Sequence, residues 1–221
     1  MSQSILVWDL PTRMFHWLLV LSFGGAFLTA ESERYRDVHV MLGYTLLGLI
    51  AFRLLWGFFG SRYARFRTFL FRPREIVAYV SALVKGKAAH YVGHNPAGSV
   101  AIWLLLVSGI VSGVTGVLLF RDIGGDMLEE LHEISSFAML AVVALHVAGV
   151  VASSMHRENL VGAMLSGRKE AEPEEGADRP YAWLGAIMLL VVVTFWAGYS
   201  AIGMMAADEV VSQSEQRDDD D

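Results

Sequence analysis

Four histidines lie in or at the start of long apolar segments, where an ionisable side chain is costly and usually marks a functional position. They are His16, His39, His132 and His146. A neutral imidazole nitrogen is a good ligand for a transition metal. The chain contains no cysteine, so disulfides, thiolate metal sites and cysteine-ligated iron–sulfur clusters are excluded.

The spacing of two of these histidines indicates more than one bound group. His132 and His146 are 14 residues apart, which in an α-helix is about 21 Å along the axis and about 40° around it. The two side chains therefore share one face at two depths. Because a single metal held by one helix needs ligands three or four residues apart, the spacing predicts two cofactors stacked along the helix.

The elements that must position these histidines are membrane-spanning helices. The 221 residues are 54% hydrophobic, with a mean hydropathy of +0.45. The apolar residues form runs close to the roughly 20 residues that cross a bilayer. We predict an all-α membrane protein with no cleaved signal peptide and five spans, at about residues 10–30, 37–59, 96–120, 127–155 and 181–206.

The spans divide the chain into unequal parts. Residues 1–165 are expected to form a four-helix transmembrane bundle, with Asp9, Asn95 and Asp126 as helix N-caps. Residues 73–87 resemble an amphipathic helix at the membrane interface. Residues 166–180 are predicted to be a polar linker, 181–206 a fifth transmembrane helix, and 207–221 an acidic disordered tail.

Basic residues set the predicted orientation, since cytoplasmic loops are enriched in Lys and Arg. Residues 60–95 carry seven and 156–180 carry four, which with Arg13 makes twelve on one side; the opposite side has four. We therefore expect a protein of the bacterial inner membrane, with a cytoplasmic N-terminus and a periplasmic C-terminus.

Depth then pairs the histidines. His39 begins its helix on the outer side, level with His132, whereas His16 and His146 each lie roughly 9–12 Å in from the cytoplasmic ends of their helices. A single histidine in a span is often an interhelical hydrogen-bonding residue. Two pairs matched in depth instead predict two b haems, each held by two histidines, an arrangement that leaves no open iron site and favours electron transfer.

Two arginines are candidate cofactor-binding residues beside the histidines. Arg53 follows His39 by 14 residues on the same helix face, at the depth of the inner haem, where a propionate could balance its charge. Snorkelling to the interface is the alternative. Arg13 is the second arginine that we predict to bind the cofactor.

Other polar and small residues have plainer interpretations. His90, His94 and His156 are expected to be solvated histidines near the cytoplasmic surface; the alternative is that they belong to a quinone or partner site. One face of the third span carries small residues, which allow close helix packing and could also leave room for a flat porphyrin. These are Gly109, Gly113 and Gly116.

Three stretches resemble a known family. Residues 7–17, VWDLPTRMFHW, look like the start of the prokaryotic cytochrome b-561 family, which includes the cytochrome b subunit of nickel–iron hydrogenases. Residues 93–98, GHNPAG, and 156–161, HRENLV, are similar to recurring stretches in it. The resemblance covers about residues 5–169 and implies a bundle with two b haems whose axial ligands match the four histidines, carrying electrons between the quinone pool and a partner.

Three functions follow as hypotheses. The first is an electron-transfer subunit that exchanges electrons with a quinone and with a c-type cytochrome, dehydrogenase or hydrogenase. The second is a stand-alone superoxide:quinone oxidoreductase, in which Arg34, Arg36 and Arg121 attract a small anion, although acidic residues crowd the same loops. The third is a haem-free transporter or channel. Membrane lipid is an expected partner and nucleic acid is not.

Overall fold

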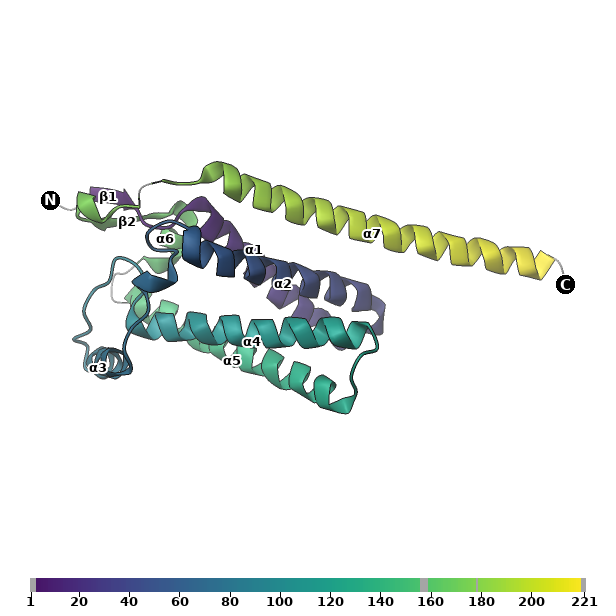
Figure 1. Ribbon diagram of the computed structural model, residues 1–221, viewed down its shortest axis with the longest axis horizontal. Helices are drawn as coiled ribbons and strands as arrows, with labels where there is room; N and C mark the ends of the chain where they lie inside the picture. Colours follow the sequence, from purple (N-terminus) through teal and green to yellow (C-terminus); the bar gives the residue numbers. More distant parts are fainter. Residues whose placement is uncertain (1–2, 156–158, 178, 220–221) are drawn as a thin grey trace.

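Four long helices form an antiparallel bundle (Figure 1). The computed structural model describes residues 3–155, 159–177 and 179–219, with no side-chain detail for 154–155 and 204–219. The bundle helices are α1 (Leu10–Thr29), α2 (Arg36–Phe59), α4 (Pro96–Phe120) and α5 (Asp126–Met155). Backbones pack closely in the order α1 on α2, α2 on α4 and α4 on α5. Facing side chains, including Phe27 and Phe137, bridge α1 and α5 instead.

Local sequence fixes where these helices begin. The carboxylate of Asp9 accepts a hydrogen bond from the backbone N–H of Thr12 at 2.8 Å, and the Asn95 side chain accepts one from Gly98 at 2.7 Å. Both are N-caps, each followed by a proline in the first turn. Asp126 was predicted to cap α5 but is its first helical residue, where its charge still complements the positive end of the helix dipole.

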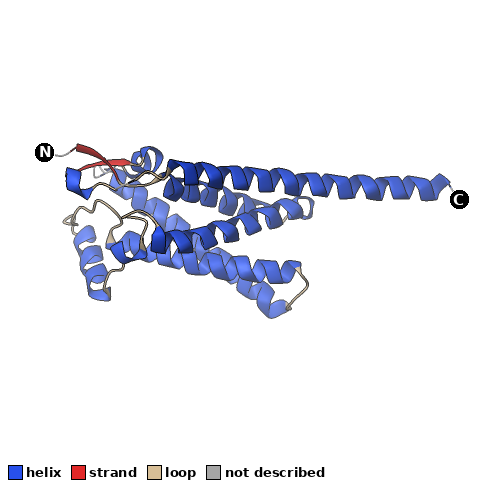
Figure 2. Ribbon diagram, turned by 45° about the horizontal axis from the view of Figure 1, so that its top comes forward, coloured by secondary structure: helices blue, strands red, loops and turns tan. Residues whose placement is uncertain are grey.

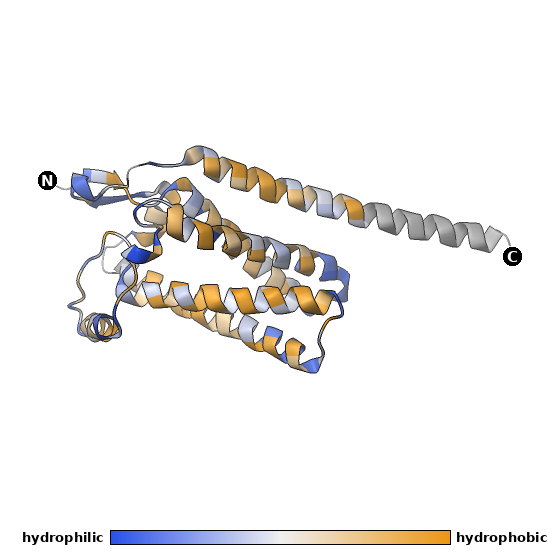
Figure 3. Cartoon of the chain, viewed as in Figure 1, coloured by the Kyte–Doolittle hydropathy of each residue, from blue (hydrophilic) through white to orange (hydrophobic). Residues whose placement is uncertain are grey.

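Apolar composition marks the membrane-spanning part of the molecule (Figure 3). Four helices are long and apolar enough to cross a bilayer within the described residues, at Glu33–Phe59, Pro96–Phe120, Asp126–Ser153 and Ala182–Gly203. The protein is therefore a multi-pass membrane protein. We predicted five spans, but α1 is not among these four; its 20 residues include Arg13, His16 and Ser22, which lower its hydropathy.

The segment predicted as a linker is folded. Strand β1 (Gln3–Leu6) pairs antiparallel with β2 (Arg168–Ala171), the two strands shown in red in Figure 2. Helix α6 (Leu160–Ser166) precedes β2, and a 3-10 turn, η3 (Pro173–Glu175), follows it. The segment is ordered because its backbone hydrogen-bonds to the N-terminus: Ala177 N–H donates to the Leu6 carbonyl at 2.7 Å.

We call β1, β2, α6 and η3 the cap. It covers one end of the bundle, the cap end, and the opposite end is the loop end. Gly167 joins α6 to β2 at φ +82°, a left-handed conformation that glycine adopts without strain. Its carbonyl accepts hydrogen bonds from the backbone N–H groups of Val7 and Trp8, at 2.8 and 3.0 Å. This turn ties the cap to the start of α1.

Helix α7 (Ala182–Asp219) packs outside the four-helix bundle, against α1 and α2. Met188 and Val192 join a core cluster with Phe15, Leu18 and Leu49. The helix runs through most of the segment that we predicted to be disordered, because no glycine or proline interrupts it after Gly203. Asp220 and Asp221 lie outside the described residues.

Short elements complete the connections. A 3-10 turn, η1 (Glu33–Tyr35), joins α1 to α2 at the loop end, and η2 (Phe66–Thr68) follows α2 at the cap end. Helix α3 (Pro73–Val84) comes next, within the interval predicted to be amphipathic, and has no buried residue.

The fold gives one prediction on stability. Asp9 is fully buried and also accepts a hydrogen bond from Trp56 Nε1 at 3.0 Å, so it links the start of α1 to the end of α2. Asp9→Ala removes the cap and leaves a buried indole N–H unpaired, and should cost about 2–4 kcal/mol. Thermal unfolding of the purified protein in detergent measures this. The exposed Asp37→Ala should stay within about 0.5 kcal/mol; equal melting of the two variants would contradict the assignment.

Candidate functional site

Two pairs of histidines face each other across the interior, one near each end of the bundle. His39 of α2 and His132 of α5 form the loop-end pair, with ring centres 6.2 Å apart. His16 of α1 and His146 of α5 form the cap-end pair, with ring centres 6.5 Å apart. These are the four histidines singled out from sequence, and they meet in the combinations that depth predicted.

Hydrogen bonds fix how the loop-end rings are oriented. His39 Nδ1 lies 2.8 Å from the carbonyl oxygen of Ala26, and His132 Nδ1 lies 2.9 Å from that of Ser112. A carbonyl oxygen only accepts, so each Nδ1 carries the proton and donates. In a neutral imidazole this leaves the Nε2 lone pair available to a ligand. Sequence reasoning missed these partners, because backbone carbonyls carry no sequence signal.

A cavity of about 500 Å³ surrounds the loop-end pair. Aromatic and small residues line it, including Phe23, Phe27, Gly43, Gly113 and Gly116. A Cβ atom at Gly116 would lie 3.0 Å from the His132 ring, so this glycine makes room for the histidine itself. Acidic residues also line the cavity, namely Glu31, Glu129 and Glu133.

The cap-end pair has a different environment. His16 Nδ1 is buried without a hydrogen-bond partner. Its ring packs edge-on against Trp17, with centres 4.9 Å apart. Trp17 Nε1 in turn donates to the Met164 carbonyl of α6 at 3.4 Å. The cap thus contacts the helix turn that carries His16.

Arg53 is one of the most buried charges in the described part of the chain, at 4% exposed. Its guanidinium lies over the rings of Phe66 and Phe69, at 5.0 and 5.6 Å from their centres. One terminal nitrogen, Nη1, is buried without a hydrogen-bond partner. A buried arginine donor of this kind needs an acceptor, so the site is suited to an anionic group.

His94 is not the solvated surface residue that we predicted. Its ring lies between Trp8 and Phe69, 4.6 Å from each ring centre, and its Nδ1 is buried without a partner. Burial, with the nearby positive charges of Arg53 and Lys169, lowers its pKa to about 3. The prediction failed because the loop before α4 folds inward against the N-terminus. His156 lies outside the described residues.

Arg13 forms a hydrogen bond with the end of helix α6, beside the cap turn at Gly167. Its Nη1 donates to the Leu165 carbonyl near the end of α6, at 2.5 Å. The last carbonyls of a helix are unsatisfied within the helix and attract cations. Arg13 therefore joins α1 to α6, and its Nε is buried without a partner.

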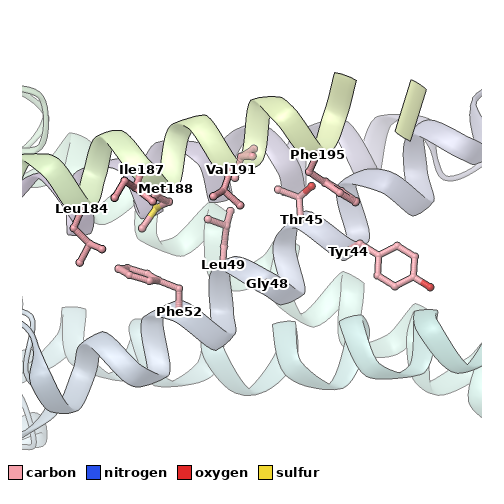
Figure 4. Close-up of a pocket in the computed structure, with 11 residues that line it drawn as sticks. Tyr44, Thr45, Gly48, Leu49, Phe52, Leu184, Ile187, Met188, Val191 and Phe195 are labelled. Carbon is pink, nitrogen blue, oxygen red and sulfur yellow. The ribbon is translucent and has the colours of Figure 1, made fainter. Parts of the chain in front are cut away.

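A second hollow lies between α2 and α7 (Figure 4). It has a volume of about 410 Å³ and almost wholly apolar walls. The hydroxyl of Thr45 donates to the Met41 carbonyl and accepts from Trp196 Nε1, at 2.8 and 2.9 Å. Thr45 is therefore already paired, and the Tyr44 hydroxyl is the other polar side-chain group among the lining residues. The groove lacks a cluster of polar groups to orient a reacting molecule, and the histidine pairs remain the candidate site.

Comparison with known proteins identifies the family. A model described as prokaryotic cytochrome b561 matches residues 7–167, an interval that contains both histidine pairs and ends at the Gly167 turn. The chain belongs to the prokaryotic cytochrome b561 family. It is a membrane b-type cytochrome that acts in electron transfer, and this family implies haem b.

Curated relatives of this cytochrome b561 cover most of its length. "Probable Ni/Fe-hydrogenase B-type cytochrome subunit" of Rhodobacter capsulatus is 22% identical over 75% of this chain and 81% of the relative. The subunit of the same name from Rhizobium leguminosarum bv. viciae is 22% identical (76% and 89%), and that from Azotobacter vinelandii 26% identical (75% and 88%). No solved structure matches this cytochrome b561.

Proposed function

We propose that this cytochrome b561 holds two b haems, each between a histidine pair, and carries electrons across the bacterial inner membrane between a quinone and a redox partner. The single observation that carries the proposal is the spacing of the rings. Two imidazoles that bind one metal from opposite sides, at a nitrogen–metal distance of about 2 Å, have ring centres about 6 Å apart. The two pairs lie at 6.2 and 6.5 Å.

The described residues fit haem better than a bare metal ion. No group of three or more His, Cys, Asp or Glu side chains could hold a metal among them. A porphyrin supplies four of the six iron ligands, so two histidines complete the set. At the loop end, the Nδ1–H bonds of His39 and His132 to carbonyls leave Nε2 to bind the iron.

Arg53 and His94 fit the propionate end of the cap-end haem. Each has a buried nitrogen without a partner, and the charge of Arg53 is felt at His94. A propionate would accept from both groups and balance the buried guanidinium charge. Arg13 stays a candidate for the same group, because its Nε is buried without a partner while its Nη1 donates to the cap.

Haem b, when bound, supplies one-electron redox chemistry. The chain contributes bis-histidine ligation, which leaves no open position for oxygen or substrate and so favours electron transfer. The histidine pairs lie near opposite ends of the bundle, so electrons can pass between the two membrane faces. The basic residues of the 60–95 and 156–180 segments support a cytoplasmic cap end and a periplasmic loop end.

The partner is best sought among hydrogenases. Three relatives with similar coverage carry the name of a Ni/Fe-hydrogenase cytochrome subunit. The acidic lining at the loop end, with Glu31, Glu129 and Glu133, argues against the superoxide hypothesis, because it would repel a small anion. The hypothesis of a haem-free transporter has no support, because the chain belongs to a family of b-type cytochromes.

The two-haem proposal predicts separable losses. The purified protein should show a b-type α-band in reduced-minus-oxidised spectra and two haems per chain by pyridine haemochrome. His132→Ala should remove one haem and His16→Ala the other, because each deletes one axial ligand of one pair. His90→Ala is the matched control and should keep both. A colourless protein, or loss of both haems from each single variant while the fold persists, would contradict the proposal.

Arg53 gives a second prediction, in redox potential. Arg53→Gln removes a buried positive charge beside the cap-end haem. The oxidised haem is then relatively favoured, so its midpoint potential should fall by roughly tens of millivolts. Potentiometric titration of the α-band should show the shift in one of the two components. Arg34→Gln, exposed at the loop end, should leave the cap-end component unchanged. Equal potentials in Arg53→Gln and wild type would argue against the propionate role.

The hydrogenase partner is tested in native membranes. If the proposal is right, hydrogen gas should reduce the b haems, and affinity purification of the tagged chain should recover a Ni/Fe hydrogenase. His132→Ala should lose reduction by hydrogen but keep a dithionite-reducible haem, because the path breaks at the loop end. If dithionite reduces the haems but hydrogen does not, a hydrogenase partner is excluded. The proposal of two haems would still stand in that case.

A further inference from the structure

Helix α3 lies crosswise to the bundle at the cap end. It is seen nearly end-on in Figure 1, and in Figure 2 it again runs across the direction of the bundle helices. It contacts α4, yet none of its residues, Pro73–Val84, is buried. Since the bundle helices α2, α4 and α5 are long and apolar enough to cross the bilayer, a helix lying across their ends runs along the membrane surface.

One face of α3 is apolar and uncovered by protein. Val77, Val80 and Val84 recur at helical spacing and are 69%, 43% and 85% exposed. The neighbouring flank is partly covered, because Tyr79 packs on Tyr91 with ring centres 5.6 Å apart. Protein therefore shields one side of the apolar stripe and leaves the three valines open.

Exposed cations lie at both ends of the same helix. Arg72 and Arg74 are at its start, and Lys85 and Lys87 directly follow it. Glu75, the acidic residue of this helix, accepts a hydrogen bond from the Arg72 backbone N–H at 2.6 Å as part of the N-terminal cap. The segment thus presents valines flanked by positive charge.

We propose that α3 is a surface anchor that inserts its valines among lipid chains and binds anionic phospholipid headgroups through these four cations. Three features favour lipid as the occupant. The helix lies across the end of the membrane-spanning helices, and its three exposed valines are not covered by another part of the described protein. The positive charge at both ends of the helix complements an anionic membrane surface. The anchor would hold the loops on both sides of α3, and so the cap end, at a fixed depth.

The absence of cysteine allows a direct test. Val80→Cys and Ala78→Cys place a single label on exposed residues about 160° apart around the helix, one on the apolar face and one turned away from the valines. Each full-length protein is labelled with an environment-sensitive fluorophore and placed in nanodiscs of phosphatidylcholine, or of phosphatidylcholine with phosphatidylglycerol. Quenching by acrylamide, a neutral water-soluble molecule, reports exposure without bias from lipid charge.

The expected result is a difference that depends on lipid charge. In phosphatidylglycerol nanodiscs the label at position 80 should be quenched several-fold less than the label at 78. The difference should shrink in pure phosphatidylcholine, and also when Arg72, Arg74, Lys85 and Lys87 are changed to Gln. Circular dichroism of that variant verifies the fold. Equal quenching at 80 and 78 in every lipid, as expected if α3 binds a protein partner and not lipid, would overturn the proposal. A difference between the two labels that does not change with lipid charge would also overturn it.

Discussion

Four imidazoles must be held in an apolar interior, and the rest of the structure is arranged around that constraint. Backbones pack tightly from α1 to α2 to α4 to α5, and side chains meet across the remaining α1–α5 face. His16 and His146 face each other near one end, while His39 and His132 do so near the other. An imidazole nitrogen left unpaired in such a medium costs free energy, and the ligand that we propose between the rings of each pair would remove that cost.

The cap and α1 show how the rest of the chain supports these pairs. Asp9 ties the start of α1 to Trp56 of α2, and the Gly167 carbonyl receives the backbone N–H groups of Val7 and Trp8. Together they hold the first turns of α1, from which His16 projects. The stretches at 7–17 and 93–98, which carry the family resemblance, meet where Trp8 packs on His94.

Two environments are built from the same kind of ligand pair. The loop-end rings are oriented by backbone carbonyls in a cavity with acidic lining. The cap-end rings lie near a buried arginine and a histidine held between aromatic rings. Charge near a haem shifts its reduction potential. If each pair holds a haem, as we propose, these different surroundings would give the two haems different potentials.

The sequence by itself determined the helices and which histidines face each other, because apolar runs, N-caps and a 14-residue spacing are local and periodic signals. Only the tertiary structure revealed the features that depend on contacts between residues far apart in the chain. Residues 166–180 look like a linker in composition, but Arg168–Ala171 within them form a strand that pairs with Gln3–Leu6. His94 looks solvated but is enclosed by residues distant in the chain. The Nδ1 partners of His39 and His132 are backbone atoms, and no residue type reveals where a carbonyl will point.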